Sequence, residues 1–326
     1  MCLRWVFLLV AIFVGRMIYG ETLTPVQTVP SSLPWLTGPL IAPPGYVVQK
    51  GHFEIEPYLY VTVDTGIYDN HWQSHSSPNF TSVNPQLLVL IGLTEWMDIQ
   101  MTPSVLYNTT QGKSSVNVGD LPIGLDFQLV AIDKWKWFPG IKLTILETFP
   151  TGKYQKLKVD RQGTDQTGEG SFITTPSLVF YKVYHVKGLH YMSMTGSLAY
   201  SLSSPVHVRG LNTYGGGQGT CGKVYLGNEF TGILSFEYSF NEHFVFAIDN
   251  VYEHQDKSTF SGRKGFSSPG VVASVGNPSS EQISFAPALE YNFSSSLGVI
   301  AGVWVTGFGR NATEFRSAAM ALDYTY

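Results

Sequence analysis

From Gly51 to the C-terminus, apolar and polar residues alternate along most of the chain with a period of two. Successive side chains of a β-strand point to opposite faces, so this pattern predicts strands with one apolar and one polar face. In the last run, for example, Met320, Leu322, Tyr324 and Tyr326 alternate with smaller or more polar residues. We therefore expect an all-β fold.

The alternating runs predict about 12 strands. They cover residues 52–65, 84–93, 96–108, 118–131, 139–149, 171–183, 188–202, 224–240, 243–256, 281–293, 297–308 and 314–326.

The connections between these strands alternate between long and short. The long polar loops are 66–83, 109–117, 150–170, 203–223 and 257–280, followed by a shorter loop at 309–313. The short turns are 94–95, 132–138, 184–187, 241–242 and 294–296. Outer-membrane barrels have short periplasmic turns, longer outer loops and an even number of strands. We predict a transmembrane antiparallel up-and-down β-barrel of about 12 strands, with the long loops 150–170 and 257–280 as plugs.

Residues 87–107, LLVLIGLTEWMDIQMTPSVLY, begin with a run that is as apolar as a transmembrane helix. A transmembrane helix needs about 18 consecutive apolar residues, and no stretch after residue 20 offers them. We interpret the segment as a hairpin whose turn is Thr94-Glu95-Trp96, with the Trp96 ring at the membrane interface. A soluble β-sandwich is a further alternative, but it would not favour the alternation of loop lengths.

The composition agrees with a barrel. Charged residues make up 13% of the chain and aromatic residues 14%, whereas soluble proteins average about 25% charged residues. The formal net charge of −4 and the lack of a basic cluster argue against a nucleic-acid partner. Cys221 is the only cysteine outside the first 20 residues, so the mature chain has no internal disulfide.

The N-terminus predicts two segments ahead of the barrel. Residues 1–20 have Arg4 followed by an apolar run, which is typical of a secretory signal peptide, with a retained anchor as the alternative. Residues 21–50 are proline-rich and have no period, so we expect a periplasmic arm outside the main fold. The barrel is then residues 51–326.

Prolines interrupt the predicted strands. Because proline has no N–H to donate to the ladder, each is a disturbance in a closed sheet, and we expect bulges to absorb it. The residues are Pro57, Pro103, Pro122, Pro176 and Pro287.

The predicted registers direct two sets of side chains into the lumen. One is a ring of carboxylates near the periplasmic end: Glu54, Glu56, Asp98, Asp126, Glu237, Glu290 and Asp323. Such a ring favours cations in a pore, or it fills the lumen as part of a salt-bridged network with Lys142. The other set is aromatic: Tyr58, Tyr60, Tyr181 and Tyr191. These rings either form a path for an apolar ligand or fill space.

Catalytic chemistry is not expected. In the sequence HWQSHSS, residues 71–77, His71 and His75 are four apart but lie in a polar loop without an acidic third ligand. His190 and His243 have no orienting group that would complete a nucleophile–base pair. We predict no enzymatic activity, no cofactor and no metal site.

The C-terminal run that ends on Tyr326 looks like the terminal-strand signal that the outer-membrane assembly machinery reads; its residues are Met320, Leu322, Tyr324 and Tyr326. The implied partners are therefore this machinery, the lipid bilayer and a small-molecule solute. The implied location is the bacterial outer membrane, as an integral protein.

Several stretches resemble the outer-membrane family named for the meta-pathway of phenol degradation, a set of transporter-like barrels. They are GLTEWMDIQ (92–100), NVGDLPIGLDFQL (117–129), FPTGKY (149–154), GEGSF (168–172), and GRNATEF with ALDYTY at the end. The resemblance spans most of residues 85–326 and implies a barrel concerned with uptake of hydrophobic or aromatic compounds, without specifying phenols. Our predicted function is passive, channel-like uptake of small solutes. The alternative is a structural or surface-exposed protein whose loops bind a partner.

Overall fold

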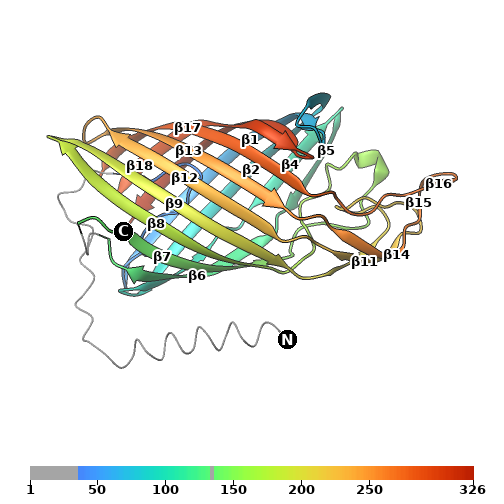
Figure 1. Ribbon diagram of the computed structural model, residues 1–326, viewed down its shortest axis with the longest axis horizontal. Coiled ribbons are helices and arrows are strands. Elements are labelled where there is room, and N and C mark those ends of the chain that lie inside the picture. Colours follow the sequence, from blue (N-terminus) through green and yellow to red (C-terminus); the bar gives the residue numbers. More distant parts are fainter. Residues whose placement is uncertain (1–35, 133–135) are drawn as a thin grey trace.

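The computed structural model describes residues 36–132 and 136–326. The predicted signal peptide, and residues 21–35 of the proline-rich segment, lie outside the described residues. The chain forms a closed antiparallel β-barrel (Figure 1). Its wall consists of β1 (Phe53–Tyr68), β2 (Ser74–Thr94), β3 (Met97–Met101), β4 (Val105–Thr110), β5 (Lys113–Val118), β6 (Leu121–Val130), β7 (Gly140–Phe149), β8 (Ile173–Lys187), β9 (His190–Ser203), β12 (Glu229–Ser239), β13 (Phe244–Gln255), β17 (Ser280–Ser294), β18 (Leu297–Arg310) and β19 (Thr313–Thr325).

The order around the wall is β1-β19-β18-β17-β13-β12-β9-β8-β7-β6-β3-β2, and β2 pairs with β1 to close it. Since β4 continues β3 and β5 continues β6, the wall has 12 strands in effect, and the predicted fold class is confirmed. We call the end with the short turns the turn end and the opposite end the loop end. At the turn end, Glu95 and Trp96 connect β2 to β3, as the sequence predicted.

At the loop end, two predicted loops are wrong. The regions 66–83 and 109–117 are largely strand, because β1, β2, β4 and β5 continue toward tight turns. Both faces of these extensions are polar, so the period of two disappears although the backbone pairing continues. Asp69 holds the turn between β1 and β2, since its Oδ1 atom accepts hydrogen bonds from the N–H groups of His71 and Gln73.

The remaining loop-end segments form a small structure of their own. It contains η1 (Val159–Arg161), β10 (Val206–Arg209), β11 (Cys221–Tyr225), β14 (Thr259–Arg263), β15 (Phe266–Ser268) and β16 (Val271–Val272). Strands β10, β11 and β14 make a sheet with its own core, which includes Val208, Tyr214 and Val224. This sheet projects beyond the barrel, at the right of Figure 1, so residues 257–280 do not plug the lumen as predicted.

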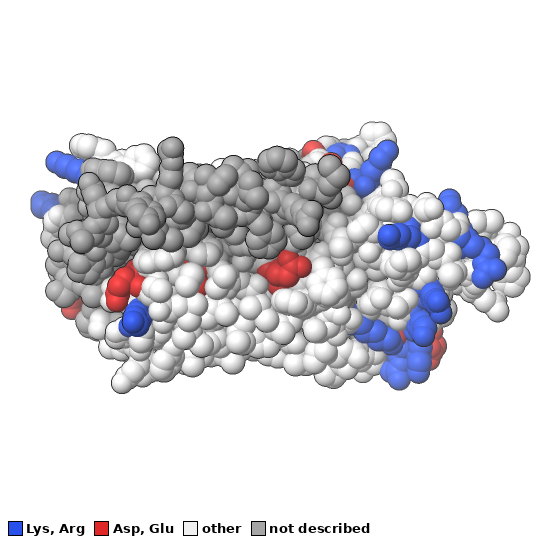
Figure 2. Space-filling model, turned by 90° about the horizontal axis from the view of Figure 1, so that it is seen from below, with Lys and Arg blue, Asp and Glu red and all other residues white. Residues whose placement is uncertain are grey.

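The outer surface of the wall is apolar. Leu198 and Leu289, for example, are 51% and 61% exposed, whereas Ser197 and Glu290 beside them are buried in the lumen. Aromatic rings cluster at the turn end, as in the contacts of Tyr291 with Phe244 and Phe293. In Figure 2 the described part of the wall is mostly uncharged, and Lys and Arg gather at the loop end.

Pro57, Pro176 and Pro287 each disturb only one of their two ladders, whereas Pro103 lies in the break between β3 and β4. In the β1–β19 ladder, pairs are missing at Glu56 and Pro57, while Pro57 still pairs with Leu87 of β2. Pro176 and Pro287 leave equivalent gaps toward β9 and β18. The N–H that proline lacks would have pointed to one neighbour, so the other ladder is intact. These gaps, rather than the expected bulges, absorb the prolines.

In the described part of the chain, no helix is long and apolar enough to cross a membrane.

Candidate functional site

The seven acidic residues predicted to line the lumen are all buried near the turn end. Their exposed fractions are 8% or less: Glu54, Glu56, Asp98, Asp126, Glu237, Glu290 and Asp323. Asp249 of β13, which the sequence analysis did not single out, is also fully buried and belongs with them. We call these eight carboxyl groups the acidic belt.

The belt is crossed by the N-terminal segment. Residues 36–48, which we call the strap, begin at β17, where the N–H of Thr37 donates to Glu290 Oε2 at 3.0 Å. They end at β3, where the N–H of Val48 donates to Asp98 Oδ2 at 2.7 Å. Because β17 and β3 lie across the barrel from each other in the closed strand order, the strap spans the lumen.

For residues 36–48, the expectation that the proline-rich segment is an arm outside the main fold is therefore wrong. The physical reason is that an extended proline-rich backbone has no hydrogen-bond partners of its own. Inside a barrel its N–H groups require acceptors, because a buried unpaired N–H is costly. The acidic belt supplies these acceptors. The sequence of the segment has no period that would have indicated its position inside the lumen.

Further bonds hold the strap along its length. The N–H groups of Ile41 and Ala42 donate to the two oxygens of Asp249, at 3.1 and 3.3 Å. The N–H of Val47 donates to Gln128 Oε1 at 3.1 Å, and the hydroxyl of Tyr46 donates to Glu54 Oε2 at 3.3 Å.

The middle of the strap packs into an apolar part of the lumen. Leu40 is 2% exposed and contacts small inward residues such as Ala286, Ala319 and Ala321. Gly45 passes against Tyr181 of β8 with no space for a side chain. The strap therefore fills the lumen through close packing as well as hydrogen bonds.

Aromatic rings lie above the strap on the side toward the loop end. The rings of Tyr58 and Tyr60 are stacked at 5.8 Å, Tyr60 contacts Trp304 edge-on at 6.5 Å, and Trp304 contacts Phe315 at 5.0 Å. We call these four residues the aromatic ladder. Its lower members, Tyr58, Tyr60 and Trp304, pack against the cluster that contains Leu40.

The sequence analysis selected only part of this ladder. Trp304 and Phe315 were missed, although the alternation in β18 places Trp304 on the same face as the buried Ile300. Tyr181 lies against the strap instead of in the ladder. Tyr191 lies at the turn end, where its ring contacts His185 at 4.8 Å.

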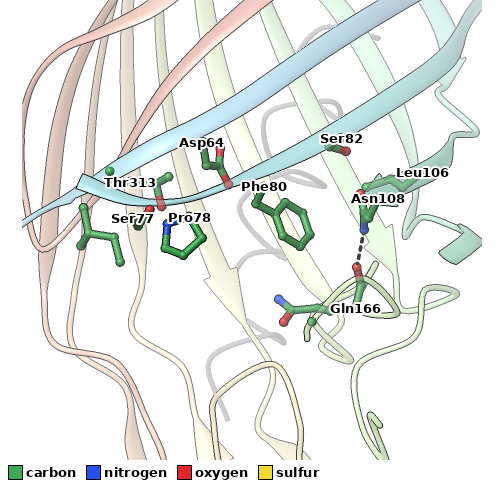
Figure 3. Close-up of a pocket in the computed structure, with 12 residues that line it drawn as sticks. Asp64, Ser77, Pro78, Phe80, Ser82, Leu106, Asn108, Gln166 and Thr313 are labelled. Carbon is green, nitrogen blue, oxygen red and sulfur yellow. Dashed lines mark hydrogen bonds between the residues drawn. The ribbon is translucent and has the colours of Figure 1, made fainter. Parts of the chain in front are cut away.

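A cavity opens in the lumen near the loop end, with a volume of about 420 Å³. Figure 3 shows Asp64 and Phe80, from β1 and β2, facing the loop that carries Gln166. The side-chain amide of Asn108 donates to the Gln166 carbonyl at 3.0 Å and holds this loop in place. Residues 163–166, within the predicted plug 150–170, thus cover part of the opening. Thr313 links the cavity to β19, the strand that carries Phe315.

The belt contains acidic groups with different surroundings. Asp98 and Asp126 face each other in the β3–β6 ladder. Lys142 Nζ lies 3.6 Å from Asp126, and both side chains are fully buried. Glu54, Glu56 and Asp323 form a second group, in which one carboxylate oxygen from each lies within 4.8 Å of the others.

The histidines weighed as catalytic candidates have structural partners. His75 lies 3.0 Å from Asp69 in the exposed β1–β2 turn. A ring nitrogen of His190 lies 3.3 Å from the Ser239 carbonyl, and one of His243 lies 2.7 Å from the Asn292 carbonyl.

Comparison with known proteins gives relatives in structure only. No family model matches the chain, and no curated protein matches it in sequence. The crystal structure of an outer-membrane channel from Pseudomonas putida F1 aligns with 87% of this chain and 100% of its own, at 14% identity and a TM-score of 0.65. The chain therefore shares the fold of that barrel.

More distant structures include the β domain of the Bordetella autotransporter BrkA, with a TM-score of 0.46, 10% identity and coverage of 85% of this chain and 100% of that one. A mutant of the monoaromatic hydrocarbon channel TodX has a TM-score of 0.41 at 12% identity, covering 86% of this chain and 91% of that one. Likenesses of this extent carry no functional argument.

Proposed function

We propose that this protein is an integral protein of a bacterial outer membrane and a channel for small hydrophobic solutes. The wall supports the location, because its outer surface is apolar and its charges are inside. Burying one leucine side chain contributes about 1.5–3 kcal/mol, so lipid is the favourable environment for this surface. A closed barrel also satisfies its backbone hydrogen bonds without water.

The aromatic ladder is the observation that carries the transport proposal. Phe315, at one end of the ladder, is two residues from Thr313 of the cavity lining, and the other three rings pack against the cluster that contains Leu40 of the strap. We infer that an apolar solute entering from the loop end passes from the cavity to these rings. The cavity, about 420 Å³, has the size of pockets that hold small organic molecules, about 300–1,000 Å³. Ring faces bind planar apolar molecules without requiring a specific polar group.

In this proposal the strap is the closed gate of the channel. It spans the lumen at the acidic belt, so passage to the turn end requires the strap to move. The predicted preference of the acidic ring for cations remains a prediction for the open channel, because the belt carboxyl groups are occupied or covered while the strap is in place.

We further propose membership of the family named for the meta-pathway of phenol degradation. Two of the stretches that carry the resemblance are in neighbouring parts of the wall, since GLTEWMDIQ forms the β2–β3 turn and NVGDLPIGLDFQL runs from β5 into β6. We propose no catalytic activity. We also propose that the outward-facing C-terminal residues Met320, Leu322, Tyr324 and Tyr326 are read by the assembly machinery.

The test is uptake of radiolabelled toluene by cells that express the protein and have an intact outer membrane, compared with cells carrying an empty vector. Faster uptake supports the proposal. Equal uptake, from protein shown to be folded in the outer-membrane fraction by its heat-modifiable gel mobility, contradicts it.

A surface-binding role is the second candidate, and one observation favours it. The β10-β11-β14 sheet projects beyond the barrel and has its own apolar core around Val208 and Tyr214. Removal of this sheet distinguishes the two roles, because a channel retains uptake without it and a partner-binding protein loses binding.

A further inference from the structure

Three carboxylates meet where the barrel closes. Glu54 and Glu56 are on β1, the first strand of the wall, and Asp323 is on β19, the last. One oxygen from each lies within 4.8 Å of the others, and the three residues are 0%, 5% and 8% exposed. We call them the seam cluster.

The ladder between β1 and β19 is broken at this cluster. Its pairs stop at Ile55–Tyr324 and resume at Tyr58–Ala321. The same register across the gap places Glu56 opposite Asp323. Like charges directly opposite each other destabilise a sheet. The closing seam therefore combines two missing pairs with a concentration of negative charge.

The hydroxyl groups that donate to the seam cluster are uncharged. Tyr46, Tyr58 and Thr325 donate hydroxyl hydrogen bonds to Glu54, Glu56 and Asp323, respectively. Each donor is neutral. The Oε1 atom of Glu54 is inaccessible to solvent and has no hydrogen-bond partner. No ion pair recorded among the described residues includes any of the three carboxylates.

One further acidic pair of the belt, Asp98 and Asp126, has a lysine beside it. Asp98 and Asp126 also face each other across a ladder. However, Lys142 lies 3.6 Å from Asp126, and Asp98 accepts the N–H of Val48. The seam cluster has one more carboxylate and lacks such a lysine.

We propose that the seam cluster binds a divalent cation, Ca²⁺. Calcium prefers oxygen ligands at about 2.3–2.6 Å, so two oxygens on one ion are up to about 5 Å apart, which fits the spacing of the cluster. Its flexible coordination accepts carboxylates from two strands, with the Tyr46 hydroxyl and water as further ligands. The orphaned Glu54 oxygen gains a partner.

The bound ion replaces the missing pairs at Pro57 with a cross-link between the first and last strands. Because Tyr46 belongs to the strap and contacts Glu54, the ion also stabilises one end of the strap. This site is independent of whether the barrel conducts hydrophobic solutes.

The experiment uses the mature chain refolded in detergent micelles and stripped with EDTA. CaCl₂ is titrated in at neutral pH by isothermal calorimetry, with MgCl₂ in a parallel titration. We expect one Ca²⁺ per chain, weaker binding of Mg²⁺, and a higher temperature for the heat-modifiable gel transition with Ca²⁺ than with EDTA. Glu56→Gln and Asp323→Asn are each expected to weaken Ca²⁺ binding at least about tenfold, equivalent to about 1.4 kcal/mol.

The matched control is Glu237→Gln, which removes an equally buried carboxylate of the same belt outside the cluster. Its Ca²⁺ affinity should equal that of the wild type. If Glu237→Gln and Glu56→Gln weaken Ca²⁺ binding equally, the ion is attracted to the belt as a whole, and the proposed site is wrong. If folded wild-type protein binds no Ca²⁺, the proposal is also wrong, and the carboxyl groups of the cluster are neutralised by protons instead. If Glu56→Gln fails to fold, terbium luminescence sensitised by the nearby tyrosines locates the ion in the wild type, and a lack of sensitised emission contradicts the proposal.

Discussion

The N–H of Val48 donates to Oδ2 of Asp98 at 2.7 Å, joining the end of a segment that crosses the lumen to the wall of the barrel. Asp98 faces Asp126 across the ladder, so one member of a like-charged pair is used as the acceptor for the strap. Through this contact and that of Glu290 with Thr37, two of the acidic residues that the sequence predicts for the lumen hold the segment that crosses it.

Asp98→Asn is expected to loosen the strap. The amide oxygen of asparagine still accepts the Val48 N–H, but the bond loses its charge assistance, which is worth about 1 kcal/mol. The probability of channel opening should rise about fivefold in single-channel recordings. Glu253→Gln, at a carboxylate of β13 nearer the loop end, is the control. An unchanged opening probability in Asp98→Asn would argue against the strap as the gate.

Deletion of the strap, residues 36–48, should produce a permanently open channel. Planar-bilayer recordings should then show discrete conductance steps, with a reversal potential in a salt gradient that favours cations because the belt is uncovered. Changing Asp98, Glu237 and Glu290 to Asn or Gln in the deleted protein should reduce that preference. If the reversal potential does not change, the acidic ring does not select ions.

Trp304→Ala should slow toluene uptake about two- to tenfold, because a ring contact contributes about 0.5–1.5 kcal/mol. Trp304→Phe should retain most of the uptake, since a ring remains between Tyr60 and Phe315. Tyr191→Ala should have no effect, because this ring lies at the turn end away from the ladder. Equal losses in Trp304→Ala and Tyr191→Ala would contradict a role for the ladder.

Lys142→Met should lower the free energy of unfolding by about 3–5 kcal/mol, because it leaves Asp126 as an uncompensated buried charge. Urea unfolding followed by tryptophan fluorescence measures this loss. The double variant Asp126→Asn, Lys142→Met should recover part of the stability. Lys50→Met, at an exposed position, should be neutral. A neutral result for Lys142→Met would mean that the pair contributes nothing.

The turn held by Asp69 should be stable well into the acidic range. Hydrogen bonds from His75 and from the N–H groups of Gln73 and His71 lower the pKa of Asp69 to about 2. Because its pKa is lowered, the Asp69 carboxylate stabilises the folded turn at pH values above the ordinary Asp pKa of about 3.9. This contribution is lost as the pH falls through about 2. NMR titration of the carboxyl group should give a midpoint near 2. A midpoint near 4 would show that these bonds do not form.

The barrel itself was predictable because an apolar outer face and a polar lumen impose a period of two on every wall strand, as in Met97–Met101 and Thr313–Thr325. The strand extensions at the loop end were not predictable, because both of their faces carry polar residues and the period of two disappears there. Trp304 could have been found from the alternation, because it is four residues from the inward Ile300 on the same face of β18.

The strap was beyond prediction for a different reason. It is held mainly by backbone N–H groups, which every residue except proline carries, so no side-chain pattern in residues 36–48 records the contacts. Only the acceptors leave a trace in the sequence, and inward carboxylates such as Glu290 and Asp98 are equally consistent with an open ring. The three-dimensional crossing of the lumen was needed to show what they bind.

The use of main-chain N–H groups to hold the strap has an evolutionary consequence. Its prolines, Pro39, Pro43 and Pro44, alternate with the residues whose N–H groups donate to the wall, so they stiffen the extended backbone without removing a donor. Since the donors at Ile41, Ala42, Val47 and Val48 are main-chain atoms, other side chains that fit the packing are compatible with the same bonds. Thr37 differs, because its hydroxyl also donates to Asn292 Oδ1 at 2.8 Å. Natural selection for these hydrogen bonds would therefore act on the carboxylates of the wall. Homologous chains would keep the same bonds even where their strap sequences no longer resemble one another.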